Sequence, residues 1–278
     1  MRQMIVRYLA MHVHAMSSLL DAVTLAAPEG AFPALFNFRA FLRGRRVRVR
    51  WNAGAACFEA VEDGVVMAFL NARQAQYAYK RGLAARRKMM EHDYLLASVP
   101  LRPGDLVVDC GANVGDLSLV VRARGPGIHY VGVEPSPSEH RCLELNVGAE
   151  AARHCGLWND AGALEFYVSS DGADSSFIEP PTYSHRITVP TVRLDSLGFD
   201  RIRLLKLEAE GAEPEVLEGA AGVLARTDFI ASDLGFERGL DQQSTFAPVV
   251  NAMLRSGFEL VDVSHGRIVA LFRRVGVT

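Results

Sequence analysis

The sequence predicts an α/β protein with a mostly parallel sheet and helices on both faces, and two observations lead to this prediction. Strand-like and helix-like segments alternate from Leu101 to the end of the chain, as in parallel sheets whose crossovers are helices. The last two strand-like runs, 259–263 and 267–272, are joined by only three residues. Because so short a link cannot hold a parallel crossover, we expect the sheet to end in an antiparallel hairpin.

The composition is typical of a globular protein. The chain has 278 residues, 49% hydrophobic and 22% charged, which excludes a disordered, collagen-like or coiled-coil protein. Residues 1–100 contain 14 lysines and arginines against 7 acidic residues, whereas the rest contains 16 against 25.

The cysteines have neither a zinc spacing nor a disulfide pattern, so we expect reduced, buried thiols and a cytoplasmic protein. They are Cys57, Cys110, Cys142 and Cys155.

The first 23 residues have the pattern of an amphipathic helix. Polar residues interrupt the apolar run and leave it too short to span a bilayer, and we expect no transmembrane segment elsewhere. The apolar stripe is expected to dock on the body of the protein or on a second copy, which predicts a homodimer. Contact with a membrane surface is disfavoured because the polar face is not strongly basic. The stripe consists of Ile5, Leu9, Met16, Leu20 and Val23.

A small β region follows this helix. Charge and apolarity alternate over residues 46–51, which predicts a half-buried strand. A solvated strand face explains its arginines better than an anionic partner such as a nucleotide-sugar, so no nucleic-acid partner is expected. Residues 72–97 are predicted to be helical. We therefore divide the chain into an N-terminal region, 1–100, and a main domain, 101–278.

The main domain is predicted element by element. Helices are expected from about residue 116, over 137–147, after 213 and over 245–256. Strands are expected at 106–110, 129–134, 164–168, 187–192, 204–208, 229–233, 259–263 and 267–272.

The strongest motif is the loop DCGANVG at 109–115, which lies between a predicted strand and a helix. Its glycines let a ligand approach the backbone, and a helix N-terminus offers unpaired N–H groups. A dinucleotide loop would have the pattern G-x-G-x-x-G, and the third glycine is missing here. The leading Asp109 would repel a pyrophosphate but suits a cationic ligand such as S-adenosylmethionine. An ordinary strand-to-helix turn is the alternative.

Glu134 supports a cofactor site. It ends the second strand, 19 residues after Gly115, where an acidic side chain can accept hydrogen bonds from ribose hydroxyls. Pro135 and Pro137 then stop the strand and turn the chain into the next helix.

From Leu101 onward the sequence resembles the FkbM family of S-adenosylmethionine-dependent methyltransferases. The stretches that carry the resemblance are VVDCGANVGDLSL, VGVEPSP, SSF at 175–177, VPTVRLDSL and LLKLEAEGAEPEVLEGA. The family's usual IDVEGAE reads LEAEGAE here, so Glu208 stands where the family has Asp. The resemblance implies a Rossmann-like, class I methyltransferase sheet of seven strands with an antiparallel final hairpin.

The resemblance also implies roles for residues of the cofactor site. Glu134 would hold the ribose, with Pro135 beside it, and Leu157 and Trp158 would lie next to the adenine. Trp158 is equally explained as a core aromatic. Asp109 would orient the loop or meet the cofactor's ammonium group through water. The methionine part would be lined by Gly111, Asn113 and Gly115.

Four charged residues crowd the end of the fourth strand, where ligands of open α/β sheets bind: Lys206, Glu208, Glu210 and Glu213. Like charges this close raise the pKa of at least one carboxylate, as a general base requires. Glu208 is the first candidate for the base, Glu210 the second and His185 an alternative. Glu208 and Asp233 could also hold Mg²⁺. A helix-capping cluster is the alternative, and it accounts for Glu213.

We therefore expect an O-methyltransferase that acts on a hydroxyl of a sugar, a glycan or a secondary metabolite, with residues 1–100 as acceptor cover or dimerisation region. The acceptor class comes from the resemblance alone. The alternatives are an N- or C-methyltransferase, an NAD-dependent oxidoreductase and a non-catalytic partner subunit.

Overall fold

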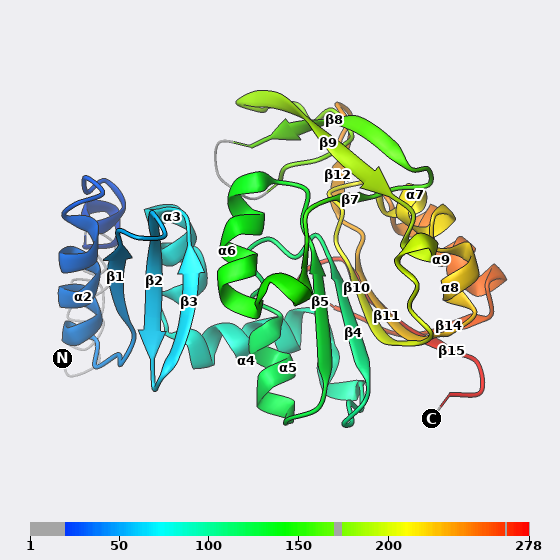
Figure 1. Ribbon diagram of the computed structural model, residues 1–278, viewed down its shortest axis with the longest axis horizontal. Coiled ribbons are helices and arrows are strands. Elements are labelled where there is room, and N and C mark those ends of the chain that lie inside the picture. Colours follow the sequence, from blue (N-terminus) through cyan, green and yellow to red (C-terminus); the bar gives the residue numbers. More distant parts are fainter. Residues whose placement is uncertain (1–19, 170–173, 265, 278) are drawn as a thin grey trace, which may run out of the picture. The chain divides into compact units, whose positions relative to one another are not determined.

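The computed structural model describes residues 20–169, 174–264 and 266–277 (Figure 1). The chain forms two compact units, one ending at Arg86 and one beginning at Arg87. The first unit contains α2 (Phe32–Leu42) and an antiparallel sheet in the order β1 (Arg48–Asn52), β2 (Cys57–Glu62) and β3 (Val65–Phe69).

Aromatic side chains form the core of the first unit. Phe32 of α2 packs edge-on against Phe58 of β2, and Phe58 stacks on Phe69 of β3. In β1, Val49 is buried between two exposed arginines, which confirms the prediction of a half-buried strand. The Asn37 amide donates to the carbonyl oxygen of Val49 and accepts from its N–H, at 2.8 and 2.7 Å. These bonds satisfy the N–H and C=O groups of Val49 on the open edge of β1.

Only the last residues of the predicted N-terminal helix are among those that the structure describes. Residues 20–25 are helical, and Val23 is 48% exposed. Asp21 forms ion pairs with Arg39 and Arg43. Ile5, Leu9 and Met16 lie outside the described residues, so the docking stripe and the homodimer stay predictions. Among the described residues, no helix has the length and apolar character needed to cross a membrane.

The structure divides the helix expected over residues 72–97 into shorter pieces. Gly82, at a φ of +102°, and Leu95, at +58°, interrupt it. The pieces are α3 (Ala72–Gln74), the π-helical η1 (Ala75–Tyr79), α4 (Leu83–Asp93) and the 3₁₀ helix η2 (Leu96–Ser98).

The second unit is built on a seven-stranded sheet, which confirms the predicted class I methyltransferase architecture. Across the sheet the order is β14 (Phe258–Val263), β15 (Val269–Arg274), β11 (Thr227–Asp233), β10 (Ile202–Leu207), β4 (Leu106–Cys110), β5 (His129–Val133) and β6 (Ala152–Arg153). The five strands β6, β5, β4, β10 and β11 are parallel, and β15 runs antiparallel to both β11 and β14.

Helices cover both faces of this sheet (Figure 1). Alternate strand residues point to opposite faces, so Val107 and Leu204 belong to one core cluster and Val108 and Leu205 to another. The helices are α5 (Ser118–Arg124), α6 (Pro137–Val147), α7 (Glu213–Glu218), α8 (Ala221–Leu224) and α9 (Phe246–Arg255), with the 3₁₀ turns η3 (Ala149–Ala151) and η4 (Leu194–Leu197).

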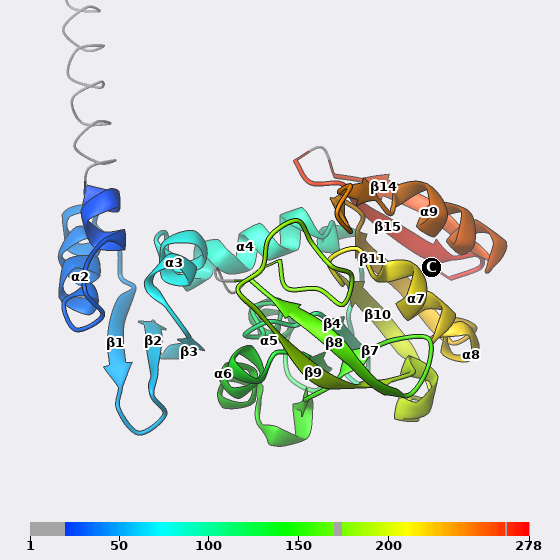
Figure 2. The ribbon, with the colours of Figure 1, turned by 90° about the horizontal axis from the view of Figure 1, so that it is seen from above.

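Two of the predicted strands lie outside the main sheet. β8 (Gly162–Val168) and β9 (His185–Val192) form a separate sheet with β7 (Gly156–Leu157). Figures 1 and 2 show this sheet over one end of the parallel strands. Ser176, between β8 and β9, donates to the carbonyl oxygen of Glu210 at 2.7 Å, so the covered end is the carboxyl end. A short ribbon of β12 (Phe236–Arg238) and β13 (Gln243–Ser244) follows β11.

The second unit begins before the boundary that we expect at residue 100. Met90, Tyr94, Leu96 and Val99 are buried in the core cluster that α5 covers. The functional division at residue 100, and the roles given to residues 1–100, stay predictions.

Candidate functional site

A loop with three left-handed residues follows β4. Gly111, Asn113 and Gly115 have φ angles of +68°, +51° and +86°. A Cβ atom at Gly111 would lie 1.9 Å from the carbonyl oxygen of Glu208, so only glycine lets the loop approach the end of β10. The amides of Gly111 and the next residue donate to the carbonyl oxygen of Val133, at 3.1 and 3.0 Å. The loop thus packs between the ends of β10 and β5.

Glu134 lies directly after β5 and is only 6% exposed. Its carboxylate accepts hydrogen bonds from the backbone amides of Asn113 and Ser136, both at 2.8 Å. Burial raises the pKa of this carboxyl to about 8, against the opposing effect of the two amides. Glu134 therefore ties the β4–α5 loop to the turn after β5.

Lys206, near the end of β10, is a buried cation beneath the same loop. Its Nζ lies 3.1 Å from Oδ1 of Asp109 and 2.9 Å from Oε2 of Glu208. It also donates to the carbonyl oxygens of Cys110 and Gly111, at 3.2 and 2.7 Å. Burial lowers the pKa of Lys206, but the two carboxylates outweigh burial and raise it.

Both carboxylate oxygens of Glu208 have partners. Oε2 accepts from the Tyr94 hydroxyl as well as from Lys206, and Oε1 lies 2.7 Å from the Arg267 guanidinium. Burial raises the pKa of Glu208, but the charges of Lys206 and Arg267 outweigh it and hold that pKa at about 2. Arg267 also pairs with Asp233. A carboxylate held in this way is a weak base.

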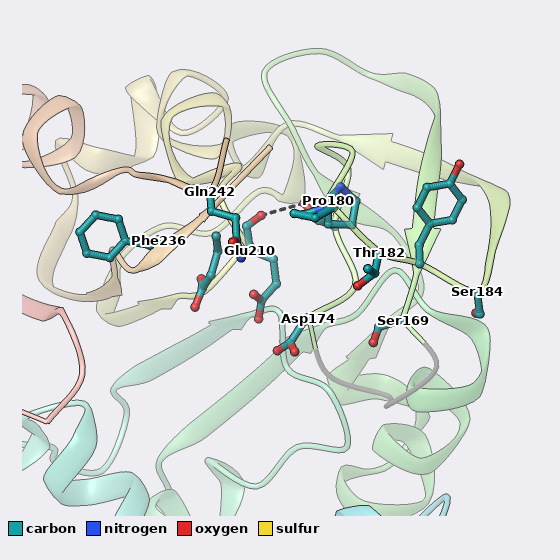
Figure 3. Close-up of a pocket in the computed structure, with 12 residues that line it drawn as sticks. Ser169, Asp174, Pro180, Thr182, Ser184, Glu210, Phe236 and Gln242 are labelled. Carbon is teal, nitrogen blue, oxygen red and sulfur yellow. Dashed lines mark hydrogen bonds between the residues drawn. The ribbon is translucent and has the colours of Figure 1, made fainter. Parts of the chain in front are cut away.

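A cavity of about 400 Å³ lies beside these strand ends (Figure 3). Two of its lining carboxyls, Glu210 and Glu237, have raised pKa values. Burial is the main cause for Glu210, with the charge of Glu237 second. Burial and the charge of Asp233 raise the pKa of Glu237 to about 7. Figure 3 shows Glu210 and Asp174 near each other at the cavity wall. The lining residues are Ser169, Asp174, Ser176, Pro180, Pro181, Thr182, Tyr183, Ser184, Glu210, Phe236, Glu237 and Gln242.

Comparison with known proteins decides the family. The model of the methyltransferase FkbM domain matches residues 109–274, more than half of the chain. The chain belongs to the FkbM methyltransferase family. This FkbM protein is therefore an S-adenosylmethionine-dependent methyltransferase, and the NAD-dependent oxidoreductase is set aside.

Two curated relatives and one solved structure illustrate the similarity. The 31-O-demethyl-FK506 methyltransferase FkbM of Streptomyces tacrolimicus is 27% identical over 56% of this chain and 73% of its own length. Methyltransferase 1 of Beauveria bassiana is 30% identical over 43% of this chain and 60% of its own. The crystal structure of methyltransferase FkbM from Methylobacillus flagellatus has 17% identity and a TM-score of 0.44, over 72% of this chain and 54% of that one.

The loop and Glu134 fit the cofactor that the family implies. Glu134 is a buried acceptor beside a loop of left-handed backbone, and ribose hydroxyls need such an acceptor. Asp109 is 1% exposed and accepts from the Tyr130 hydroxyl at 2.7 Å, which favours a role in orienting the loop. The assignment of these residues to the cofactor stays a proposal.

The expected Mg²⁺ site finds no support. Arg267 pairs with both Glu208 and Asp233, so a guanidinium already compensates the carboxylates that we expected around the ion. Over the described parts of the chain, no group of three His, Cys, Asp or Glu residues could hold a metal.

The remaining expected residues have local or packing contacts. His185 begins β9, is exposed and has Nδ1 2.9 Å from the Ser184 hydroxyl. Leu157 is buried in a core cluster, and the Trp158 ring lies 5.7 Å from that of Phe177, so both have packing contacts; their place beside adenine stays a prediction. Pro135 is half-buried between Glu134 and the next helix.

Glu213 is explained by loop structure. Its Oε1 accepts from the amides of Ala209 and Gly211, at 2.8 and 3.2 Å, and its Oε2 accepts from the Thr245 hydroxyl at 2.9 Å. This supports the capping interpretation of that residue.

Sequence reasoning missed Glu237, Tyr94 and Arg267. The position of Glu237, soon after the fifth parallel strand, was the available signal for it. Tyr94 is 114 residues from Glu208 in the sequence, and nothing local to either residue indicates their contact.

Proposed function

We propose that this FkbM protein transfers a methyl group to a hydroxyl of a sugar, a glycan or a hydroxylated metabolite held in the cavity beside Glu210. The single observation that carries the proposal is the chemistry of the cavity wall. Hydroxyl, amide and carboxylate side chains predominate there, and Pro180, Pro181 and the rings of Tyr183 and Phe236 supply the apolar surface. Such a wall suits a polyhydroxylated acceptor better than an apolar lipid or polyketide.

Glu210 and Glu237 supply the base in this proposal. Both line the cavity, and burial raises both pKa values, helped by the charge of Glu237 at Glu210 and by the charge of Asp233 at Glu237. Because the pKa of Glu237 is about 7, part of the protein has this carboxyl ionised near neutral pH and free to accept the proton of the acceptor hydroxyl. Glu208, held by two cations, instead stabilises the end of β10.

The cofactor loop completes the proposed site. When bound, S-adenosylmethionine supplies an activated methyl group. Glu134 holds the ribose hydroxyls, and Gly111 allows the loop to approach the strand that leads to Glu210. The small sheet of β7, β8 and β9 covers the carboxyl end of the main sheet and limits the access of water to the acceptor.

The test uses S-adenosylmethionine with a ¹³C-labelled methyl group and a panel of free sugars and hydroxylated macrocycles. The chemical shift of the label in the product distinguishes O-methyl from N-methyl and C-methyl groups. We expect O-methyl products, and we expect Glu210→Gln to lower turnover by about 10²–10⁴ while leaving cofactor affinity within a few-fold. N-methyl or C-methyl products alone would refute the proposed function.

A further inference from the structure

We propose that Lys206 is a positioning residue that sets the cofactor loop by holding two of its peptide planes. The inference rests on the proposed cofactor site. Lys206 is 2% exposed and lies on β10, where every residue from Ile202 to Leu207 is buried. An ammonium group at such a place loses its hydration, so each of its contacts needs a reason.

The contacts of Lys206 go beyond charge compensation. Asp109 and Glu208 already balance its charge, at 3.1 and 2.9 Å. Its Nζ nevertheless also contacts the carbonyl oxygens of Cys110 and Gly111. Compensation of charge alone does not require these two backbone contacts.

The two carbonyl groups belong to the first two peptide units of the loop. The N–H of each unit, on Gly111 and Ala112, donates to the carbonyl oxygen of Val133. Because a peptide unit is planar, holding its C=O from β10 and its N–H from β5 sets the orientation of the whole plane. Lys206 thereby links the loop for the methyl donor to the strand that leads to the acceptor cavity.

The chain offers a matched control on the same strand. Arg203 is 8% exposed, lies 2.9 Å from Asp228 and donates to the carbonyl oxygen of Pro100 at 3.0 Å. It is therefore also a buried cation with a carboxylate and a carbonyl partner, but near the opposite end of β10. Arg203→Met should lower the melting temperature and leave the affinity for S-adenosylhomocysteine within twofold.

Lys206→Met should lower the affinity for S-adenosylhomocysteine about ten- to a hundredfold, as expected for loss of hydrogen bonds from a charged group. Amide hydrogen exchange without cofactor should become at least tenfold faster at Gly111 and Ala112. In the single variant Asp109 loses its cation while Glu208 keeps Arg267, so Lys206→Met/Glu208→Gln restores the net charge of the cluster without restoring the contacts of Lys206. The Cys110 carbonyl oxygen then keeps the backbone amide of Glu208, at 3.3 Å, and the Gly111 carbonyl group loses its contact with β10. The double variant should show the same fast exchange and weak binding.

Several results would overturn the proposal. Wild-type affinity and exchange in the double variant would mean that Lys206 only compensates charge. Equal loss of affinity in Arg203→Met would mean a general effect of stability. If neither Lys206→Met nor the double variant folds, amide hydrogen exchange in the wild-type protein provides the test. Exchange at Gly111 and Ala112 as fast as in exposed loops would mean that these peptide planes are not held. Absence of S-adenosylhomocysteine binding by the wild type would instead refute the cofactor site, and exchange would still test Lys206.

Discussion

Replacing Gly111 with alanine should separate the cofactor loop from β10. The new Cβ would lie 1.9 Å from the carbonyl oxygen of Glu208, whereas an ordinary contact begins near 3.4 Å. The loop and the strand end must therefore move apart by more than an ångström. A shift of about 1 Å near reacting groups can lower a rate by about 10². The left-handed φ of +68° adds about 1–2 kcal/mol of strain.

Gly148→Ala provides the control for this prediction. Gly148 has a φ of +90°, is exposed after α6, and a Cβ there would meet nothing within 4 Å. It should show the strain without the clash.

Calorimetric titration with S-adenosylhomocysteine and thermal unfolding measure the two effects. We expect a melting-temperature decrease in both variants, and a loss of affinity of at least tenfold in Gly111→Ala alone. Wild-type affinity in Gly111→Ala would refute both the steric argument and the placement of the cofactor at this loop.

Three further predictions concern charge and assembly. Because burial raises the folded-state pKa of Glu134 to about 8, its contribution to stability is complete below the ordinary value of 4.5 and is lost as the pH rises through 8. Glu134→Gln should flatten this dependence in melting curves between pH 5 and 9, and should weaken S-adenosylhomocysteine binding about tenfold; an unchanged pH profile would contradict the role of burial. Turnover should rise as the pH increases through about 7, and this rise should disappear in Glu237→Gln but remain in the control Glu165→Gln, on the surface of β8. If Glu237→Gln keeps the rise, Glu237 is not the base. Light scattering should show a dimer that dissociates when residues 1–25 are deleted, and a monomer at high concentration in both proteins would exclude the predicted dimer.

The sequence predicted those features that depend on neighbours along the chain. The run 106–110 is apolar enough to be a buried strand, and the glycines after it indicated the loop whose left-handed residues the structure contains. The final hairpin followed from the length of its link. Glu134 was predicted because it follows a strand directly and its role depends on that place.

Only the tertiary structure decided how the charged residues divide their roles. Glu208 was the first candidate for the base because it shares a short stretch with other acids, but Lys206, Arg267 and Tyr94 surround it in space. Lys206 is a neighbour in sequence, but Tyr94 and Arg267 come from two distant segments, and a pKa depends on all charges within a few ångströms, whatever their distance in sequence. Similarly, β8 and β9 were predicted as strands but not placed in their own sheet, because strand propensity depends on neighbouring residues whereas strand pairing depends on distant ones.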